Sequence, residues 1–230
     1  MLEGAHVPLT RAEAAALIDH TLLRPGAARE EIVRHCREAI ERGFRAVCLY
    51  PAHLAVAAEI LSGSRVILAG VVSFPHGAST LLGKIFESLE AWKLGASELD
   101  IVLDLSAIAS GDRARIEEEV RTLMERTEEC RHKFIVETGM FHRDQIEPVL
   151  KVMNQRRPAF VKTSTGVNAP GATPEAVAHL RAALDKSIGI KASGGIRTPG
   201  QVEALVAAGA TVIGTSDGVE IVNQIAGRTE

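Results

Sequence analysis

Eight short apolar runs recur along the chain, and they constrain its fold more than any other feature. They lie at 17–23, 44–50, 65–72, 98–105, 133–138, 159–163, 188–193 and 211–216. Each run is apolar at both alternating sets of positions, which is typical of strands buried on both faces of a parallel sheet. The sequence therefore predicts eight parallel strands.

Amphipathic stretches separate these runs and carry signals for helix starts. Thr173 and Thr198 each precede a proline, so a hydroxyl cap is followed by proline at the first helical position. Thr10 and Glu13 have the spacing of a capping box, which predicts a short extra helix before the first strand. Eight strand–helix units in 230 residues predict an α/β fold, a (β/α)8 TIM barrel. The alternative is a doubly wound open sheet.

Composition indicates one globular domain spanning residues 1–230. Hydrophobic residues make up 46% of the chain and no Pro-, Gly- or Ser-rich linker divides it, so a sizeable core is expected. A formal net charge of -3 with 3% aromatic residues argues against a nucleic-acid partner, because phosphate backbones select clustered basic side chains.

The same chain shows no features of export or membrane insertion. The N-terminal stretch lacks a cationic segment followed by a long apolar one, and no run reaches the roughly 18 apolar residues of a membrane span. Cys36, Cys48 and Cys130 form no CxxC pair, so neither a metal cage nor a disulfide framework is predicted. We expect a cytoplasmic protein with no membrane partner.

Two lysines stand inside apolar runs, Lys162 in FVKTSTG and Lys191 in GIKASGG. An ammonium group that loses hydration has a lowered pKa, and a neighbouring cation lowers it further. The neutral amine can attack a carbonyl and form a Schiff base, which then acts as an electron sink. Because the sixth and seventh strands are neighbours in a barrel, we expect the two lysines at matching heights, one as nucleophile and the other as its electrostatic activator.

A structural explanation of the lysines is also open, in which each pairs with an interior carboxylate. The available carboxylates are Asp19, Asp100, Asp104 and Glu137. Asp100, in the middle of the fourth run, could instead shuttle a proton to or from a substrate hydroxyl through water.

Glycine and hydroxyl residues cluster after the last two runs. Gly194 and Gly195 follow the seventh run, and Gly214 lies in the eighth, shortly before Ser216. Barrels often bind phosphate in these two loops, where glycine lets backbone amides approach the anion. Arg197 could add a bidentate contact.

His20, His76 and Cys48 are interpreted as structural. We expect His20 to hydrogen-bond within the barrel mouth, His76 to lie on a loop, and Cys48 to be a small core residue. Neither histidine has the spacing of a metal site such as HExxH, so no metal is predicted.

Seven motifs together resemble the deoxyribose-phosphate aldolases, a family of class I aldolases. They occur in the family's order and cover nearly the whole chain: IDHTLLRP (18–25), VCLYP (47–51), ELDIVLDLSAIASGD (98–112), VETG (136–139), VKTSTG (161–166), GIKASGGIRT (189–198) and IGTSDGV (213–219).

The resemblance implies a lyase that cleaves 2-deoxy-D-ribose 5-phosphate reversibly to acetaldehyde and D-glyceraldehyde 3-phosphate, without a cofactor. It implies that Lys162 forms the Schiff base, that Lys191 makes its amine easier to deprotonate, and that Asp100 takes part in proton relay. The implied supporting residues are Asp19, Thr21, Cys48 and Thr163. The implied phosphate-binding residues are Gly166, Gly194, Gly195, Arg197, Gly214, Ser216 and Asp217. The expected partners are small-molecule substrates and further copies of the chain, as a dimer or tetramer.

The chain departs from the family pattern at several positions. Asp217 replaces a serine, Val212 stands where arginine is frequent, Val167 stands where some members have lysine, and Asp104 and Ser106 replace an asparagine and a glycine. These departures concern substrate recognition. They leave open an aldolase of the same family that acts on a different or non-phosphorylated acceptor. A phosphosugar isomerase using Asp100 and a second carboxylate, and a non-catalytic phosphosugar-binding barrel, are further alternatives.

Asp217 itself has two interpretations. Pointing into the site, its carboxylate would repel a phosphate dianion and could accept a hydrogen bond from a substrate hydroxyl. Pointing away, it would cap the helix that follows.

Overall fold

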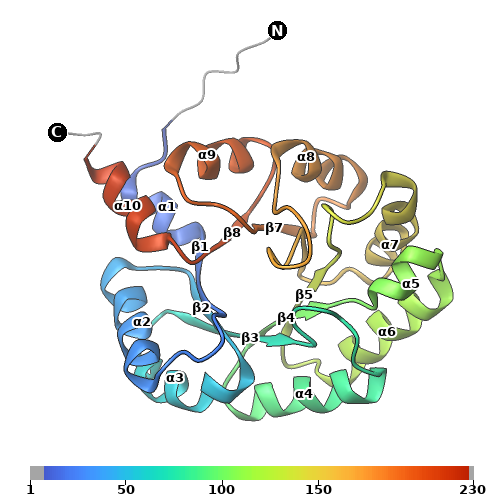
Figure 1. Cartoon of the computed structure of the whole chain (residues 1–230), viewed down its shortest axis with the longest axis horizontal. Coiled ribbons are helices and arrows are strands. Elements are labelled where there is room, and N and C mark those ends of the chain that lie inside the picture. The colour runs from blue at the N-terminus through green and yellow to red at the C-terminus, as the bar shows by residue number, and fades with distance from the viewer. Residues whose placement is uncertain (1–7, 228–230) are drawn as a thin grey trace, which may run out of the picture.

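A computed structural model describes residues 8–227, in which eight parallel strands close into a barrel in chain order (Figure 1). The strands are β1 (Ile18–Leu22), β2 (Ala46–Leu49), β3 (Ile67–Val72), β4 (Glu98–Val102), β5 (Arg131–Ile135), β6 (Phe160–Lys162), β7 (Gly189–Ser193) and β8 (Val212–Thr215). Each lies within or overlaps one of the eight apolar runs, so the predicted (β/α)8 barrel is confirmed. The expectation about a signal peptide falls partly on residues 1–7, outside the described part.

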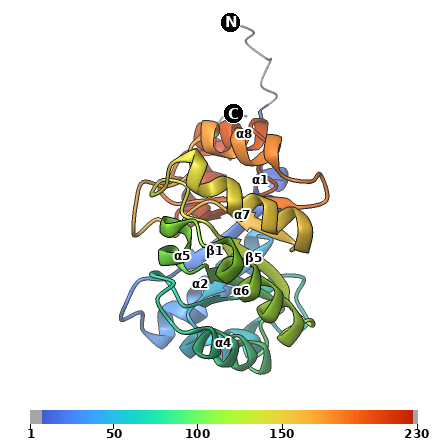
Figure 2. The same cartoon turned by 90° about the vertical axis from the view of Figure 1, so that its right-hand side faces the viewer.

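Helices surround the barrel, and α4 and α8 lie on opposite sides of it (Figures 1 and 2). They are α1 (Arg11–Leu17), α2 (Arg29–Arg42), η1 (Pro51–His53), α3 (Leu54–Leu61), α4 (Leu81–Lys93), α5 (Leu105–Ser110), α6 (Arg113–Arg126), α7 (Arg143–Arg156), α8 (Pro174–Ala183), α9 (Pro199–Ala207) and α10 (Gly218–Ala226). Within residues 8–227, no helix has both the length and the apolar character that crossing a membrane requires.

The predicted helix starts are confirmed. Thr10 accepts a hydrogen bond from the Glu13 amide at 3.2 Å, and Glu13 accepts one from the Thr10 amide at 2.8 Å, which completes the capping box of α1. The hydroxyl oxygens of Thr173 and Thr198 accept hydrogen bonds from backbone amides at the starts of α8 and α9, and Thr198 also forms a capping box with Gln201. The extra helix α1 packs beside α10, the last helix of the described residues (Figure 1).

The main hydrophobic core lies between the sheet and the helices. In β4, Leu99 and Ile101 point outward into this core and are fully buried. Side chains alternate along a strand, so Glu98 and Asp100 point inward instead, and they too are buried. The inside of the barrel therefore holds charged groups, while its outside carries the apolar packing.

Candidate active site

Lys162 on β6 and Lys191 on β7 are directly paired in the parallel register. The Nζ atom of each donates a hydrogen bond to Oδ2 of Asp100, at 2.7 Å in both cases. The expectation that the two lysines stand at matching heights is confirmed. Asp100, in the middle of β4, joins them across the barrel interior.

Carboxylates do pair with the two lysines, but only some of those predicted. Lys191 contacts Asp19 Oδ2 at 2.6 Å as well as Asp100. The prediction is wrong for Asp104 and Glu137, which the backbone directs elsewhere. Asp104 caps α5 and pairs with an arginine of α6, while Glu137 accepts a hydrogen bond from the Thr165 amide at 2.6 Å.

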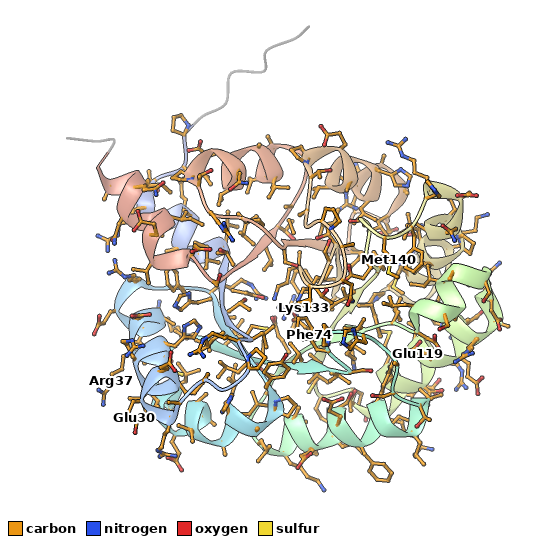
Figure 3. The ribbon with its side chains drawn as sticks, in the orientation of Figure 1. Glu30, Arg37, Phe74, Glu119, Lys133 and Met140 are labelled. Atoms are coloured by element: carbon orange, nitrogen blue, oxygen red, sulfur yellow. The ribbon has the colours of Figure 1, made fainter. Side chains whose placement is uncertain are left out.

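A third lysine, Lys133, lies in the barrel interior and was missed by sequence reasoning. It is fully buried and appears at the centre of the barrel in Figure 3. Its Nζ lies 2.7 Å from Asp100 Oδ1 and 2.8 Å from Glu98 Oε2. Lys133 therefore occupies the oxygen of Asp100 that the other two lysines leave free.

Arg45 completes the interior charges at the N-terminal ends of the strands. One of its nitrogens lies 2.6 Å from Asp19 Oδ1, and both contact the Glu98 carboxylate, at 2.5 and 2.9 Å. We call the following seven residues the charge network: Asp19, Arg45, Glu98, Asp100, Lys133, Lys162 and Lys191. Opposite charges alternate through it, so each buried ion has a partner.

The charge network fixes the ionisation of most of its members. Burial disfavours the charge of Asp19, but the charges of Lys191, Lys133 and Arg45 outweigh it and lower its pKa to about 2. Burial also disfavours the charge of Asp100, but the charges of the three lysines, that of Lys133 most strongly, outweigh it. They hold the pKa of Asp100 well below its usual value. Burial likewise opposes the charge of Lys191, yet the carboxylates of Asp100 and Asp19 raise its pKa. Lys191 is therefore a permanent positive charge beside Lys162.

Lys162 differs from the other buried lysines because it reaches a cavity. Its side chain is 3% exposed and lines a hollow of about 330 Å³ at the C-terminal ends of the strands. Thr21 also lines this cavity. All seven residues predicted to bind phosphate are on its wall: Gly166, Gly194, Gly195, Arg197, Gly214, Ser216 and Asp217.

Glycines allow the cavity wall to form by close backbone approach. A Cβ atom on Gly194, whose φ is +94°, would lie 2.8 Å from Cα of Gly171 and 2.9 Å from Cα of Gly166. A Cβ on Gly214 would lie 2.9 Å from Cε of Lys191. Gly214 therefore makes room for a lysine of the charge network, a role that its sequence context did not indicate.

An apolar wall faces the lysines and was missed by sequence reasoning. The Phe74 ring centre lies 5.8 Å from Lys162 Nζ, and Tyr50 packs edge-on against it (Figure 3 labels Phe74). Cys48 lies beneath them, fully buried in a small apolar cluster, with its Sγ 3.8 Å from Asp100 Oδ2. Burial, reinforced by the Asp100 charge, raises the pKa of this thiol to about 11. The prediction of Cys48 as a core residue is confirmed.

Comparison with known proteins identifies the family. The sequence profile of the DeoC/LacD family aldolases matches residues 14–222. The chain belongs to this aldolase family. Deoxyribose-phosphate aldolase of Clostridium kluyveri is 40% identical to this aldolase over 217 residues, which are 94% of the chain and 100% of the relative.

Solved structures agree with this assignment. The aldolase QR15 superposes with a TM-score of 0.89 at 34% identity, covering 94% of this chain and 97% of its own. The tetrameric deoxyribose phosphate aldolase of Aeropyrum pernix superposes with a TM-score of 0.86 at 30% identity, covering 94% and 92% of the two chains.

Two threonines expected to support the aldolase site hold strand ends in place. The hydroxyl of Thr21 donates to the carbonyl of Asp19 at 2.9 Å, and that of Thr163 accepts from the Ser193 amide at 3.2 Å. Both hydroxyls thereby fix the backbone, that of Thr21 beside Asp19 and that of Thr163 next to Lys162.

The expectation for His20 is wrong, because its ring lies outside the barrel against α2. It stacks on His35 with ring centres 3.6 Å apart and contacts Glu38 at 3.3 Å. Residues alternate in β1, so an inward Asp19 forces His20 outward. One possible metal-ligand atom from each of these three side chains lies within 4.8 Å of the other two. His76 is on a loop as predicted and contacts Asn168 at 3.1 Å.

Proposed function

We propose that this aldolase cleaves 2-deoxy-D-ribose 5-phosphate reversibly to acetaldehyde and D-glyceraldehyde 3-phosphate, through a Schiff base on Lys162. The observation that carries the proposal is the pairing of Lys162 with Lys191 on one oxygen of Asp100, with Lys162 facing the cavity. The family assignment and the relatives named deoxyribose-phosphate aldolase support the substrate.

Lys162 is the best placed of the interior lysines to lose a proton. Among residues 8–227, Asp100 is the carboxylate that its Nζ contacts. Lys191 is held by Asp19 in addition, and Lys133 by Glu98. Removing a proton from Lys191 or Lys133 would take the positive charge away from at least two buried carboxylates, whereas Lys162 contacts one. Lys191 and Lys133 therefore keep their ammonium forms.

The reaction then follows from the neutral amine. Lys162 Nζ attacks C1 of the open-chain sugar, and loss of water gives an iminium ion. The C3 hydroxyl gives up its proton, the C2–C3 bond breaks, and its electron pair moves toward the iminium nitrogen to form an enamine. Glyceraldehyde 3-phosphate leaves, C2 takes up a proton, and water releases acetaldehyde and the free amine.

The other members of the charge network assist these steps by position. Lys191 stays positive and disfavours a second charge on Lys162 before each turnover. Asp100 stays ionised and orients both amines, and a water molecule beside it would carry protons between the C3 hydroxyl and C2. Phe74 would cover the two-carbon fragment on Lys162 and limit its exposure to solvent.

The loops after β7 and β8 would hold the phosphate. Backbone amides of Gly194, Gly195 and Ser216 are the proposed donors, assisted by Arg197. Of the other family departures, Val167 lines the cavity, whereas Val212 is buried in β8 and 2% exposed.

We also propose that residues 1–230 form one domain, that it acts in the cytoplasm, and that it assembles into a homo-oligomer. The three free, buried cysteines suit a reducing compartment.

Leu82 and Phe86, one helical turn apart on α4, are 61% and 64% exposed and would be covered by a second copy. The tetrameric Aeropyrum pernix relative is a precedent for such assembly.

Trapping the intermediate tests the proposed function. Incubation with acetaldehyde and borohydride should add one ethyl group to the protein, and peptide mapping should place it on Lys162. Lys162→Ala should prevent the addition and abolish acetaldehyde release, while the exposed-lysine control Lys151→Ala should do neither. An adduct mapped only to another lysine would refute the assignment. Substrate turnover without acetaldehyde would favour the isomerase alternative.

A further inference from the structure

Four charged side chains line the cavity, and one of them is acidic. They are Arg24, Lys162, Arg197 and Asp217. Lys162 is the proposed nucleophile. The remaining three determine the charge that the distal end of a sugar would meet.

Asp217 occupies the N-cap position of α10, but its side chain makes no capping hydrogen bond. Its carboxylate accepts a hydrogen bond from the Ser216 hydroxyl at 3.2 Å. The capping interpretation of Asp217 is therefore wrong as far as hydrogen bonding goes, and the interpretation that places it at the site agrees with its position on the cavity wall.

The two arginines do not leave an uncompensated positive site. Arg24 contacts both oxygens of Glu31 at 2.7 Å, so its charge is already balanced. Arg197 is 78% exposed, and its Nε lies 3.9 Å from Asp217 Oδ2. A phosphate dianion would have to share Arg197 with Asp217. It would also have to compete with the Asp217 carboxylate for the Ser216 hydroxyl.

We propose that Asp217 is a specificity-determining residue. It lowers the ratio of kcat/KM for a phosphorylated sugar to kcat/KM for a sugar that ends in a hydroxyl. The carboxylate repels a phosphate dianion, whereas it can accept a hydrogen bond from a terminal hydroxyl. This inference rests on the proposed function and extends its substrate class to 2-deoxy sugars and acceptor aldehydes with a free terminal hydroxyl.

The test compares Asp217→Asn with the native protein on deoxyribose 5-phosphate and on deoxyribose. Asparagine keeps the size and an oxygen acceptor for Ser216 but removes the charge. The ratio of kcat/KM for the phosphorylated over the free sugar should rise about fivefold, chiefly through KM of the phosphorylated sugar. Glu128→Gln is the matched control, because it removes one exposed negative charge from the connection between α6 and β5, at the other end of the barrel.

A second measurement does not depend on turnover. The Kd of glycerol 3-phosphate should fall about fivefold in Asp217→Asn and stay unchanged in Glu128→Gln. A ratio and a Kd both within twofold of the native values would overturn the role of Asp217. If the native protein neither cleaved deoxyribose 5-phosphate nor formed the borohydride-reduced adduct, the proposed function itself would be refuted. Failure of the Asp217 role and failure of the proposed function therefore give different results.

Discussion

Lys162 and Lys191 face each other from neighbouring strands and share one oxygen of Asp100, each at 2.7 Å. One carboxylate oxygen thus lies between two amines. The second oxygen of Asp100 is taken by Lys133, so the carboxylate cannot turn to favour either amine. The relationship places the positive charge of Lys191 directly beside the Lys162 amine.

Removing the charge of Lys191 should move the pH dependence of the reaction. In Lys191→Leu the positive charge that repels a second ammonium in the interior is lost, so the neutral amine needed for attack on a carbonyl is less favoured. Activity at neutral pH should fall on the order of a hundredfold and recover partly under alkaline conditions. Lys191→Arg, which keeps the charge but crowds Gly214, should be slower with an unshifted profile. A Leu variant with the native pH–rate profile would contradict this role.

Lys133 should act as a positioning residue with a large effect on stability. Lys133→Met leaves Glu98 and Asp100 buried without this partner, and breaking such a pair costs about 3–5 kcal/mol. Urea unfolding should show that loss, while the exposed control Lys186→Met should unfold like the native protein. Acetaldehyde and borohydride should still modify Lys162 in the folded variant, but with an altered pH dependence. Unchanged stability and pH dependence would remove Lys133 from this role.

Three buried histidines should make the fold sensitive to mild acid. Burial lowers the pKa of His20 to about 4, of His35 to about 3 (with help from His20) and of His132 to about 4, all from 6.5. Between these values and 6.5 the unfolded chain binds more protons than the folded one, so stability falls as pH falls through that window. Each histidine contributes a slope of up to about 1.4 kcal/mol per pH unit.

Urea unfolding at several pH values between 7 and 4.5 measures this slope. His35→Leu removes one titrating group and should make the dependence shallower. An equal slope in the variant would show that His35 does not titrate in this way. Asp19, with its pKa lowered to about 2 from 3.8, adds stability that is lost only at lower pH and so does not confuse the comparison.

Adjacent glycines on the β7 loop should differ in their tolerance of a methyl group. Gly194 and Gly195 both have positive φ, so alanine is strained at either by about 1–2 kcal/mol. At Gly194 the added Cβ would also collide with the backbone of Gly166 and Gly171, whereas at Gly195 nothing lies within 4 Å. Gly194→Ala should therefore raise KM for deoxyribose 5-phosphate well above the value for Gly195→Ala. Equal KM values would contradict the packing argument.

The barrel could be predicted from sequence because its strands are apolar on both faces and its helices carry local caps. The same pattern identified Lys162 and Lys191, since a charge inside such a run is conspicuous. Pairing in a closed barrel then follows from strand order alone. The matching heights followed from the similar place of each lysine near the end of its apolar run.

Lys133 was missed because it is the first residue of the apolar run 133–138, which predicts a place at the start of the strand, away from the site. The strand begins at Arg131, so Lys133 is central and in register with Asp100. His20 was predicted to face the barrel mouth, but its neighbour Asp19 faces the interior, so His20 points outward. For Lys133 the error lies in its height along the strand, because β5 starts two residues earlier than the apolar run. For His20 it lies in the face of the strand, because a one-residue step reverses the direction of a side chain.

The hydrogen bond between Asp19 and Lys191 joins residues 172 positions apart, from β1 and β7. A chain truncated before β7 would contain the reactive amine of Lys162 but neither its neighbouring cation nor the last strands that seal the ring. Fragments that end between β6 and β7 should consequently not form the Schiff base even where they fold. The proposed chemistry therefore requires the closed barrel, in which β7 supplies Lys191 and β8 pairs with both β7 and β1.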